Sequence, residues 1–92
     1  EIVKDVAFII KKDVEQKALY DVIKHAGSRL LTNIEVFDVY TGENVDKDKK
    51  SIAYKLTFTD MDKTLTDEEV MNVFNKIIDD VTSKMDAKLR NM

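Results

Sequence analysis

The sequence predicts an α+β fold of four strands and two helices in the order β-α-β-β-α-β. Three observations carry this prediction. Segment 51–59 alternates between apolar and polar residues, with the period of two of a half-buried strand. Segment 66–84 opens with a capping box and then repeats apolar residues at the spacing of a helix face. The chain of 92 residues has room for one domain, 1–92.

The first half of the chain predicts a strand and then a helix. Residues 2–12 form a short, β-prone apolar run, which favours a strand. Residues 14–26 change to a helical period, with Asp13 expected as the N-cap and Gln16 as its capping-box partner. Gly27 stands where a helix ends on a residue with positive φ. The apolar face of this helix consists of Leu19, Val22, Ile23 and Ala26.

The middle of the chain predicts two strands joined by a polar connection. Residues 30–40 return to β character, and residues 41–50 are dense in charge. Residues 51–59 follow as the alternating strand. Its bulky set comprises Ile52, Tyr54, Leu56 and Phe58.

The second helix has the clearest start signal. The Thr66 hydroxyl can accept from the backbone N–H of Glu69, whose carboxylate can reach back to the Thr66 backbone. The helix runs to about Lys84, and residues 86–91 make a short final strand. Its apolar face consists of Val70, Val73, Phe74, Ile77, Ile78, Val81 and Met85.

This order of elements is the signature of a ferredoxin-like βαββαβ sandwich. Two right-handed crossovers place both helices on one face of a four-stranded antiparallel sheet and leave the other face open. Strand parity then divides the side chains between the two faces, unless a bulge interrupts a strand. The helix face is expected to receive Val6, Phe8, Ile10, Phe37, Val39, Ala87 and Leu89. The open face is expected to carry Asp5, Ala7, Ile9, Asp38, Tyr40, Ser51, Ala53, Lys55, Thr57, Lys88 and Arg90.

The open face has one aromatic residue, Tyr40, among hydrogen-bonding and cationic groups. An exposed aromatic side chain on an antiparallel sheet is one way in which proteins hold an unstacked RNA base. A single tyrosine on a solvated sheet needs no function, because isolated exposed apolar groups are normal. The residues alone leave both interpretations open.

Composition excludes several classes of protein. The net charge of −3 argues against a strongly basic nucleic-acid or membrane binder. The absence of Cys excludes disulfides and zinc–sulfur sites, and His25, as the one histidine, has no partner for a metal site. No apolar run approaches a membrane span, and the start is unlike a signal peptide. No glycine-rich phosphate motif is present, so the chain does not bind ATP by those routes.

Four stretches resemble a known family. They are FDVYTGENV (37–45), KKSIAYKLTF (49–58), TLTDEEV (64–70) and AKLR (87–90). In this order and spacing they are similar to the ferredoxin-fold anticodon-binding domain that closes the β chain of bacterial phenylalanyl-tRNA synthetases. The resemblance runs through nearly the whole sequence, and we therefore expect a C-terminal module of a longer chain.

The resemblance implies a non-catalytic role in a cytoplasmic ligase. The domain would grip the anticodon of tRNA(Phe) while the α subunit carries out aminoacylation with ATP and magnesium. It would need no cofactor and no membrane. Its protein partners would be the rest of the β chain and the α subunit, in a heterotetramer of two α and two β chains.

The resemblance also implies roles for residues. The base-stacking tyrosine of the family matches Tyr40, its nearby carboxylate Asp38, its serine Ser51 and its small first-strand residue Ala7. Arg90 matches the terminal arginine, for which a phosphate contact and a structural ion pair both stay open. The expected RNA-binding set is therefore Tyr40, Asp38, Ser51, Ala7, Arg90, Lys55 and Lys88.

Two alternatives remain. Lys47, Lys49 and Lys50 of the charged connection either contact phosphates or belong to a solvated hairpin tip. The same fold also serves as a ligand-sensing or protein-docking module. A small autonomous enzyme has little support, since no nucleophile–base constellation is visible.

Overall fold

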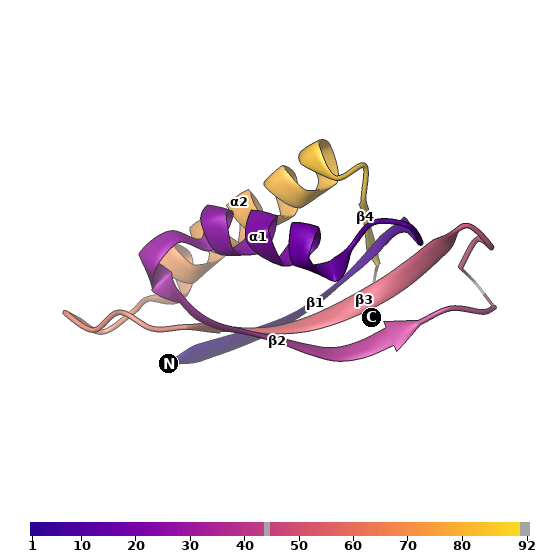
Figure 1. Ribbon diagram of the computed structural model, residues 1–92. Coiled ribbons are helices and arrows are strands. Elements are labelled where there is room, and N and C mark those ends of the chain that lie inside the picture. The colour runs from indigo at the N-terminus through magenta and orange to yellow at the C-terminus, as the bar shows by residue number, and fades with distance from the viewer. Residues whose placement is uncertain (44, 91–92) are drawn as a thin grey trace.

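The computed structural model describes residues 1–43 and 45–90 and has the predicted order of elements. The elements are β1 (Ile2–Lys11), α1 (Gln16–Gly27), the 3-10 helix η1 (Ser28–Leu30), β2 (Leu31–Tyr40), β3 (Lys49–Phe58), α2 (Asp67–Lys84) and β4 (Lys88–Arg90). The strands form one antiparallel sheet in the order β2-β3-β1-β4. Both helices lie over the same face of this sheet (Figure 1). The ferredoxin-like α+β fold is thus confirmed.

The core lies between the helices and the two central strands. Val6, Phe8 and Ile10 of β1 are buried, as parity predicts. All four bulky side chains of the alternating strand, from Ile52 to Phe58, have no exposed surface. Leu19 and Ile23 of α1 and Val70, Ile77 and Val81 of α2 close the core from above.

The prediction that Phe37 lies in the core is wrong, because β2 contains a bulge at this residue. Val36 pairs with Tyr54 and Asp38 pairs with Ala53, so Phe37 is the extra residue between them. Its exposed fraction is 46%. The bulge resets the parity so that Val36 and Asp38 face opposite sides of the sheet.

Two further residues face the helix side yet stay out of the core. Val39 pairs with the buried Ile52, and Leu89 pairs with the buried Phe8. Both nevertheless remain exposed, at 47% and 44%. They belong to the edge strands β2 and β4, which the helices shield less than the central pair. Parity assigns their face correctly and overstates their burial.

The predicted N-cap of α1 is also wrong. The backbone N–H of Val14 donates to the Lys11 carbonyl at 3.1 Å, so a tight turn occupies the residues around Asp13. The first helical hydrogen bond is accepted by the carbonyl of Glu15, from the N–H of Ala18 at 3.1 Å. Glu15 is therefore the N-cap, and its side chain makes no capping bond.

The end of α1 differs from the prediction in one respect. Ser28, and not Gly27, has the positive φ, at 57°. Gly27 stays helical with φ of −71°. It is needed for space, because a Cβ at this position would lie 2.4 Å from Cδ2 of Leu31.

The predicted Thr66 cap of α2 is confirmed, while the Glu69 carboxylate reaches back to the Thr66 hydroxyl and not to the predicted backbone N–H. The Glu69 N–H donates to Oγ1 of Thr66 at 3.2 Å, and this hydroxyl donates to Oε1 of Glu69 at 3.0 Å. Hydrogen bonds from Lys63 and Thr66 outweigh partial burial and hold the pKa of Glu69 below its usual value.

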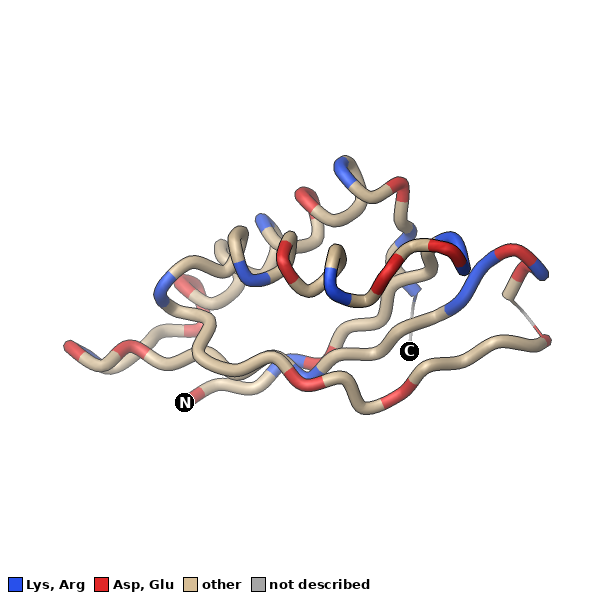
Figure 2. Tube along the Cα trace, viewed as in Figure 1, with Lys and Arg blue, Asp and Glu red and all other residues tan. Residues whose placement is uncertain are grey.

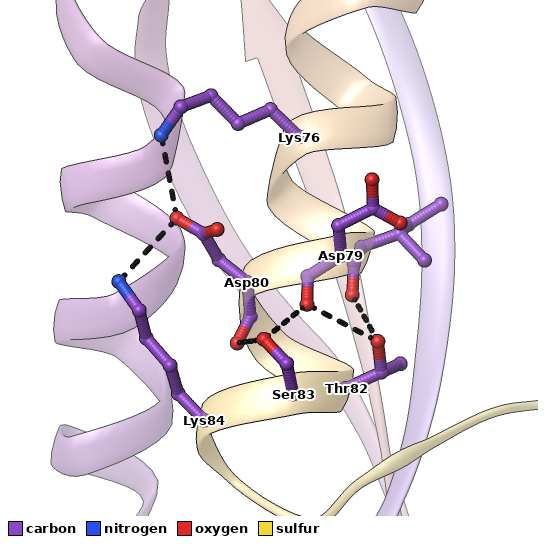
Figure 3. Close-up of polar contacts among 7 residues, drawn as sticks. Lys76, Asp79, Asp80, Thr82, Ser83 and Lys84 are labelled. Atoms are coloured by element: carbon purple, nitrogen blue, oxygen red, sulfur yellow. Dashed lines mark hydrogen bonds and ion pairs between the residues drawn. The ribbon is translucent and has the colours of Figure 1, made fainter.

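The last turns of α2 carry a network of polar contacts (Figure 3). Asp80 pairs with Lys76 at 3.3 Å and with Lys84 at 3.7 Å, one turn before and one turn after it. Partial burial raises the pKa of Asp80, but the two ammonium groups outweigh it and the net shift is downward. The hydroxyls of Thr82 and Ser83 donate to carbonyls of the preceding turn. The carboxylate of Asp80 and the ammonium groups of Lys76 and Lys84 are thus paired within the helix.

Candidate nucleic-acid interface

The face of the sheet opposite the helices is uncovered (Figure 1). Residues paired across antiparallel strands point to the same face, so the register arranges this face in rows. One row consists of Tyr40, Ser51, Ile9 and Lys88. The next consists of Asp38, Ala53, Ala7 and Arg90. The two rows bring together six of the seven residues expected to bind RNA; Lys55 lies one row further along.

The connection that follows β2 fixes the position of the Tyr40 side chain. Its hydroxyl donates to the backbone carbonyl of Glu43 at 3.0 Å. Gly42 has a backbone φ of 138°, a conformation that residues other than glycine rarely adopt. A Cβ on Gly42 would also lie 3.3 Å from Oη of Tyr40. Gly42 therefore serves the turn and in addition leaves room for the ring.

Arg90 lies over the ring of Tyr40. Its guanidinium carbon is 5.2 Å from the ring centroid, within the ~6 Å of a cation–π contact. The two residues come from β4 and β2, the opposite edges of the sheet. With about 4.8 Å between neighbouring strands, both side chains must reach across the face to meet. They meet above β3 and β1.

The floor of this face is made of small residues. Ser51, Ala53 and Ala7 have exposed fractions of only 3%, 3% and 1%, although no helix covers them. Tyr40 is paired with Ser51 and Arg90 with Ala7 in the register, and the two larger side chains meet across this floor. A base that reaches the Ser51 hydroxyl from above therefore requires one of those side chains to move.

Lys55 also lies on the open face, but its neighbours make it less suited to bind a phosphate. It pairs with Glu35 on β2 and with Asp5 on β1, so a carboxylate lies on each side of it. These two carboxylates offset the positive charge of Lys55 in the absence of RNA. By contrast, Lys88 is exposed in the Tyr40 row, and Asp38 is exposed in the row next to it.

The lysines of the charged connection separate into different roles. Lys50 donates from Nζ to the carbonyl of Val14 at 2.7 Å, a bond that ties β3 to the start of α1. Lys49 belongs to β3 itself and pairs with Lys11 on β1. Lys47 is exposed in the turn before β3.

Sequence reasoning missed Lys11. Its strand parity is that of Ala7 and Ile9, so the alternation already assigns it to the open face. Lys11 stands beside Lys12 and Asp13 near the end of the predicted strand, in a polar cluster typical of a strand boundary. The signal was present in the sequence.

Other kinds of site find no support in residues 1–43 and 45–90. No group of three or more His, Cys, Asp or Glu side chains is arranged to hold a metal ion there. Neither helix in those residues combines the length and apolar character that crossing a membrane requires.

Comparisons with known proteins agree on one family. The model of the ferredoxin-fold anticodon binding domain matches residues 1–90. The phenylalanine–tRNA ligase β subunit of Listeria monocytogenes (strain EGD-e) is 40% identical over 90 residues, which are 98% of this chain and 11% of that protein. The corresponding subunit of Carboxydothermus hydrogenoformans is 39% identical over the same shares of the two chains. The sequence thus spans about a ninth of the length of these relatives.

Proposed function

Because the chain belongs to the ferredoxin-fold anticodon binding domain family, we propose that it recognises the anticodon of tRNA(Phe) as a non-catalytic module of a phenylalanine–tRNA ligase β subunit. The observation that carries the proposal is the meeting of Tyr40 and Arg90 above Ser51 and Ala7, on the face that no helix covers. This arrangement offers a flat aromatic surface, hydrogen-bonding groups and a cation at one place.

Each residue has a distinct task in this proposal. The ring of Tyr40 stacks on an anticodon base, which every base allows because each has a π-face. The Ser51 hydroxyl and the Asp38 carboxylate hydrogen-bond to base or ribose edges. Ala7 keeps the floor low, so that a base fits once Arg90 moves aside. Lys88 adds positive charge beside the site.

The chain positions the tRNA while the chemistry takes place elsewhere. We assign aminoacylation, ATP and magnesium to the α subunit, as the family resemblance implies. The module works in the cytoplasm, at the C-terminal end of the β chain, in a ligase of two α and two β subunits. With a net charge of −3, it relies on the rest of the ligase for most contacts to the tRNA backbone.

Aminoacylation kinetics of the ligase that carries this chain test the proposal. Since stacking is worth ~1–3 kcal/mol per base, Tyr40→Ala is expected to lower kcat/KM for tRNA about 5–150-fold. Tyr40→Phe retains the ring and is expected to keep most of the activity. Tyr20→Ala is the matched control, because Tyr20 is partly exposed on α1, on the other side of the sheet. An unchanged kcat/KM in a folded Tyr40→Ala ligase would favour the alternative, a ligand-sensing or protein-docking module.

A further inference from the structure

Charge is unevenly distributed along the open face. The row of Lys55 contains two carboxylates, Glu35 and Asp5, and a single ammonium group. The row of Tyr40 contains Lys88 and no carboxylate. The last pair of the β1–β3 ladder, Lys11 and Lys49, consists of two ammonium groups. The potential of this face therefore becomes more positive from the Lys55 row toward the Lys49 end.

The Lys11–Lys49 pair is unfavourable in the protein alone. The residues lie directly opposite each other, and like charges in such a pair destabilise the sheet. None of the ion pairs among the described residues includes Lys11, Lys49 or Lys88. Asp13 and Asp48 border an open hollow together with Lys11, but they lie in the connections beyond the strand ends. An anion bound between the two ammonium groups would attract both of them and so offset their mutual repulsion.

The pair adjoins the proposed base site. Lys49 is two residues from Ser51 along β3, and Lys11 is two residues from Ile9 along β1. At about 3.4 Å per residue, the pair is roughly 7 Å from the row of Tyr40. In Figure 2, Lys and Arg positions lie near this end of the sheet, where β1 ends and β3 begins, with Asp and Glu positions among them in the adjoining connections. A base on Tyr40 thus has its own backbone within reach of these cations.

We propose that Lys11 and Lys49, with Lys88, bind the phosphates of the RNA strand that flank the base held at Tyr40. The strand then crosses the face at the Lys49 end and stays away from the Glu35–Lys55–Asp5 row. This inference rests on the proposed function and adds the path of the backbone to it.

The salt dependence of tRNA binding by the ligase tests this path. For two single-strand phosphate contacts, Lys11→Gln/Lys49→Gln is expected to reduce the slope of log K against log salt by about 1.4 and to weaken binding up to about 25-fold at 0.1 M salt. The matched control is Lys24→Gln/Lys76→Gln, which removes two ammonium groups from the helices. An unchanged slope in the first variant would overturn the proposal.

A second variant separates binding from folding. Lys49→Glu creates an ion pair with Lys11, so the 92-residue chain is expected to unfold at a higher urea concentration while the ligase binds tRNA more weakly. A parallel fall in stability and binding would contradict the proposal.

The proposed function has a readout of its own. Should Tyr40→Ala lower kcat/KM while the lysine variants leave the salt slope unchanged, the path of the backbone is wrong and the base site stands. Should Tyr40→Ala also have no effect, the proposed function itself is wrong.

Discussion

The guanidinium carbon of Arg90 lies 5.2 Å from the centroid of the Tyr40 ring, although the two residues belong to opposite edge strands. Arg90 thus occupies one face of the ring. A base must either use the other face or displace the guanidinium. Because a cation–π contact at an exposed site is worth only ~0.5–1 kcal/mol, displacement costs less than stacking returns. The displaced cation is then free for a phosphate.

Arg90→Ala is expected to weaken tRNA binding by the ligase. Loss of one phosphate contact lowers the slope of log K against log salt by about 0.7, which corresponds to about fivefold in Kd at 0.1 M salt. Arg90→Lys keeps the charge and is expected to retain most of the affinity. Tighter binding by Arg90→Ala would mean that Arg90 only competes with the base for the ring.

Gly42→Ala is expected to destabilise the chain and to disturb Tyr40. A side chain at φ of 138° is strained, at a cost of about 1–3 kcal/mol. The added Cβ would also press on Oη of Tyr40, 3.3 Å away. Urea unfolding measures the loss, with Thr41→Ala at the exposed neighbouring position as control. Equal stability of Gly42→Ala and the parent would show that the turn adapts without strain.

Tyr54→Phe is expected to stabilise the protein. Tyr54 is fully buried, and its hydroxyl has no hydrogen-bond partner among the described residues. An unsatisfied buried polar group costs about 1–3 kcal/mol, so its removal should raise the free energy of unfolding on the order of 1 kcal/mol. A loss of stability would reveal a partner for this hydroxyl.

The same substitution should change the alkaline limb of the stability curve. Burial raises the pKa of Tyr54 to about 12 from an ordinary value of 10.0. The unfolded state therefore releases this proton first, and unfolding becomes more favourable as the pH rises from 10.0 to about 12. Tyr54→Phe should lose less stability than the parent over this range. Parallel curves for the two proteins would contradict the assignment.

Asp60 is expected to contribute to the acid limb of the curve of stability against pH. The backbone N–H of Asp62, 2.9 Å from Oδ1, is the first cause that holds the pKa of Asp60 below its ordinary value of 3.8, and the Arg29 cation assists. The stabilisation is present above pH 3.8 and is lost as the pH falls through the lower folded value. Asp60→Asn should be less stable at pH 7 and should change less with acid. Asp62→Asn, at an exposed position, is the control.

The regular parts of the fold were predictable from the sequence because their signals are local. The alternation from Ile52 to Phe58 and the helix cap at Thr66 each depend on a few neighbouring residues, and both are confirmed. The start of α1 was not predictable in this way. Asp13 has the capping side chain there, but the turn between Lys11 and Val14 moves the start of the helix past it, to Glu15.

The open face, likewise, was predictable from the sequence only in part. Parity identified the residues of each strand that share this face, and the register confirms that placement for Ala7, Asp38, Tyr40 and Ser51. The bulge at Phe37 has no local signal in β2, since it depends on how that strand pairs with β3. The contact between Tyr40 and Arg90 joins residues 50 positions apart and requires the order of the strands.

A double-mutant cycle between Tyr40 and the anticodon tests whether this side chain holds an anticodon base. kcat/KM is measured for the parent and Tyr40→Ala ligases with tRNA(Phe) that is intact or abasic at each anticodon position in turn. At one position, we expect the abasic tRNA and Tyr40→Ala to lower kcat/KM by similar factors and the combination to lower it little further. Losses that multiply independently at all three positions would show that Tyr40 stacks on none of the anticodon bases.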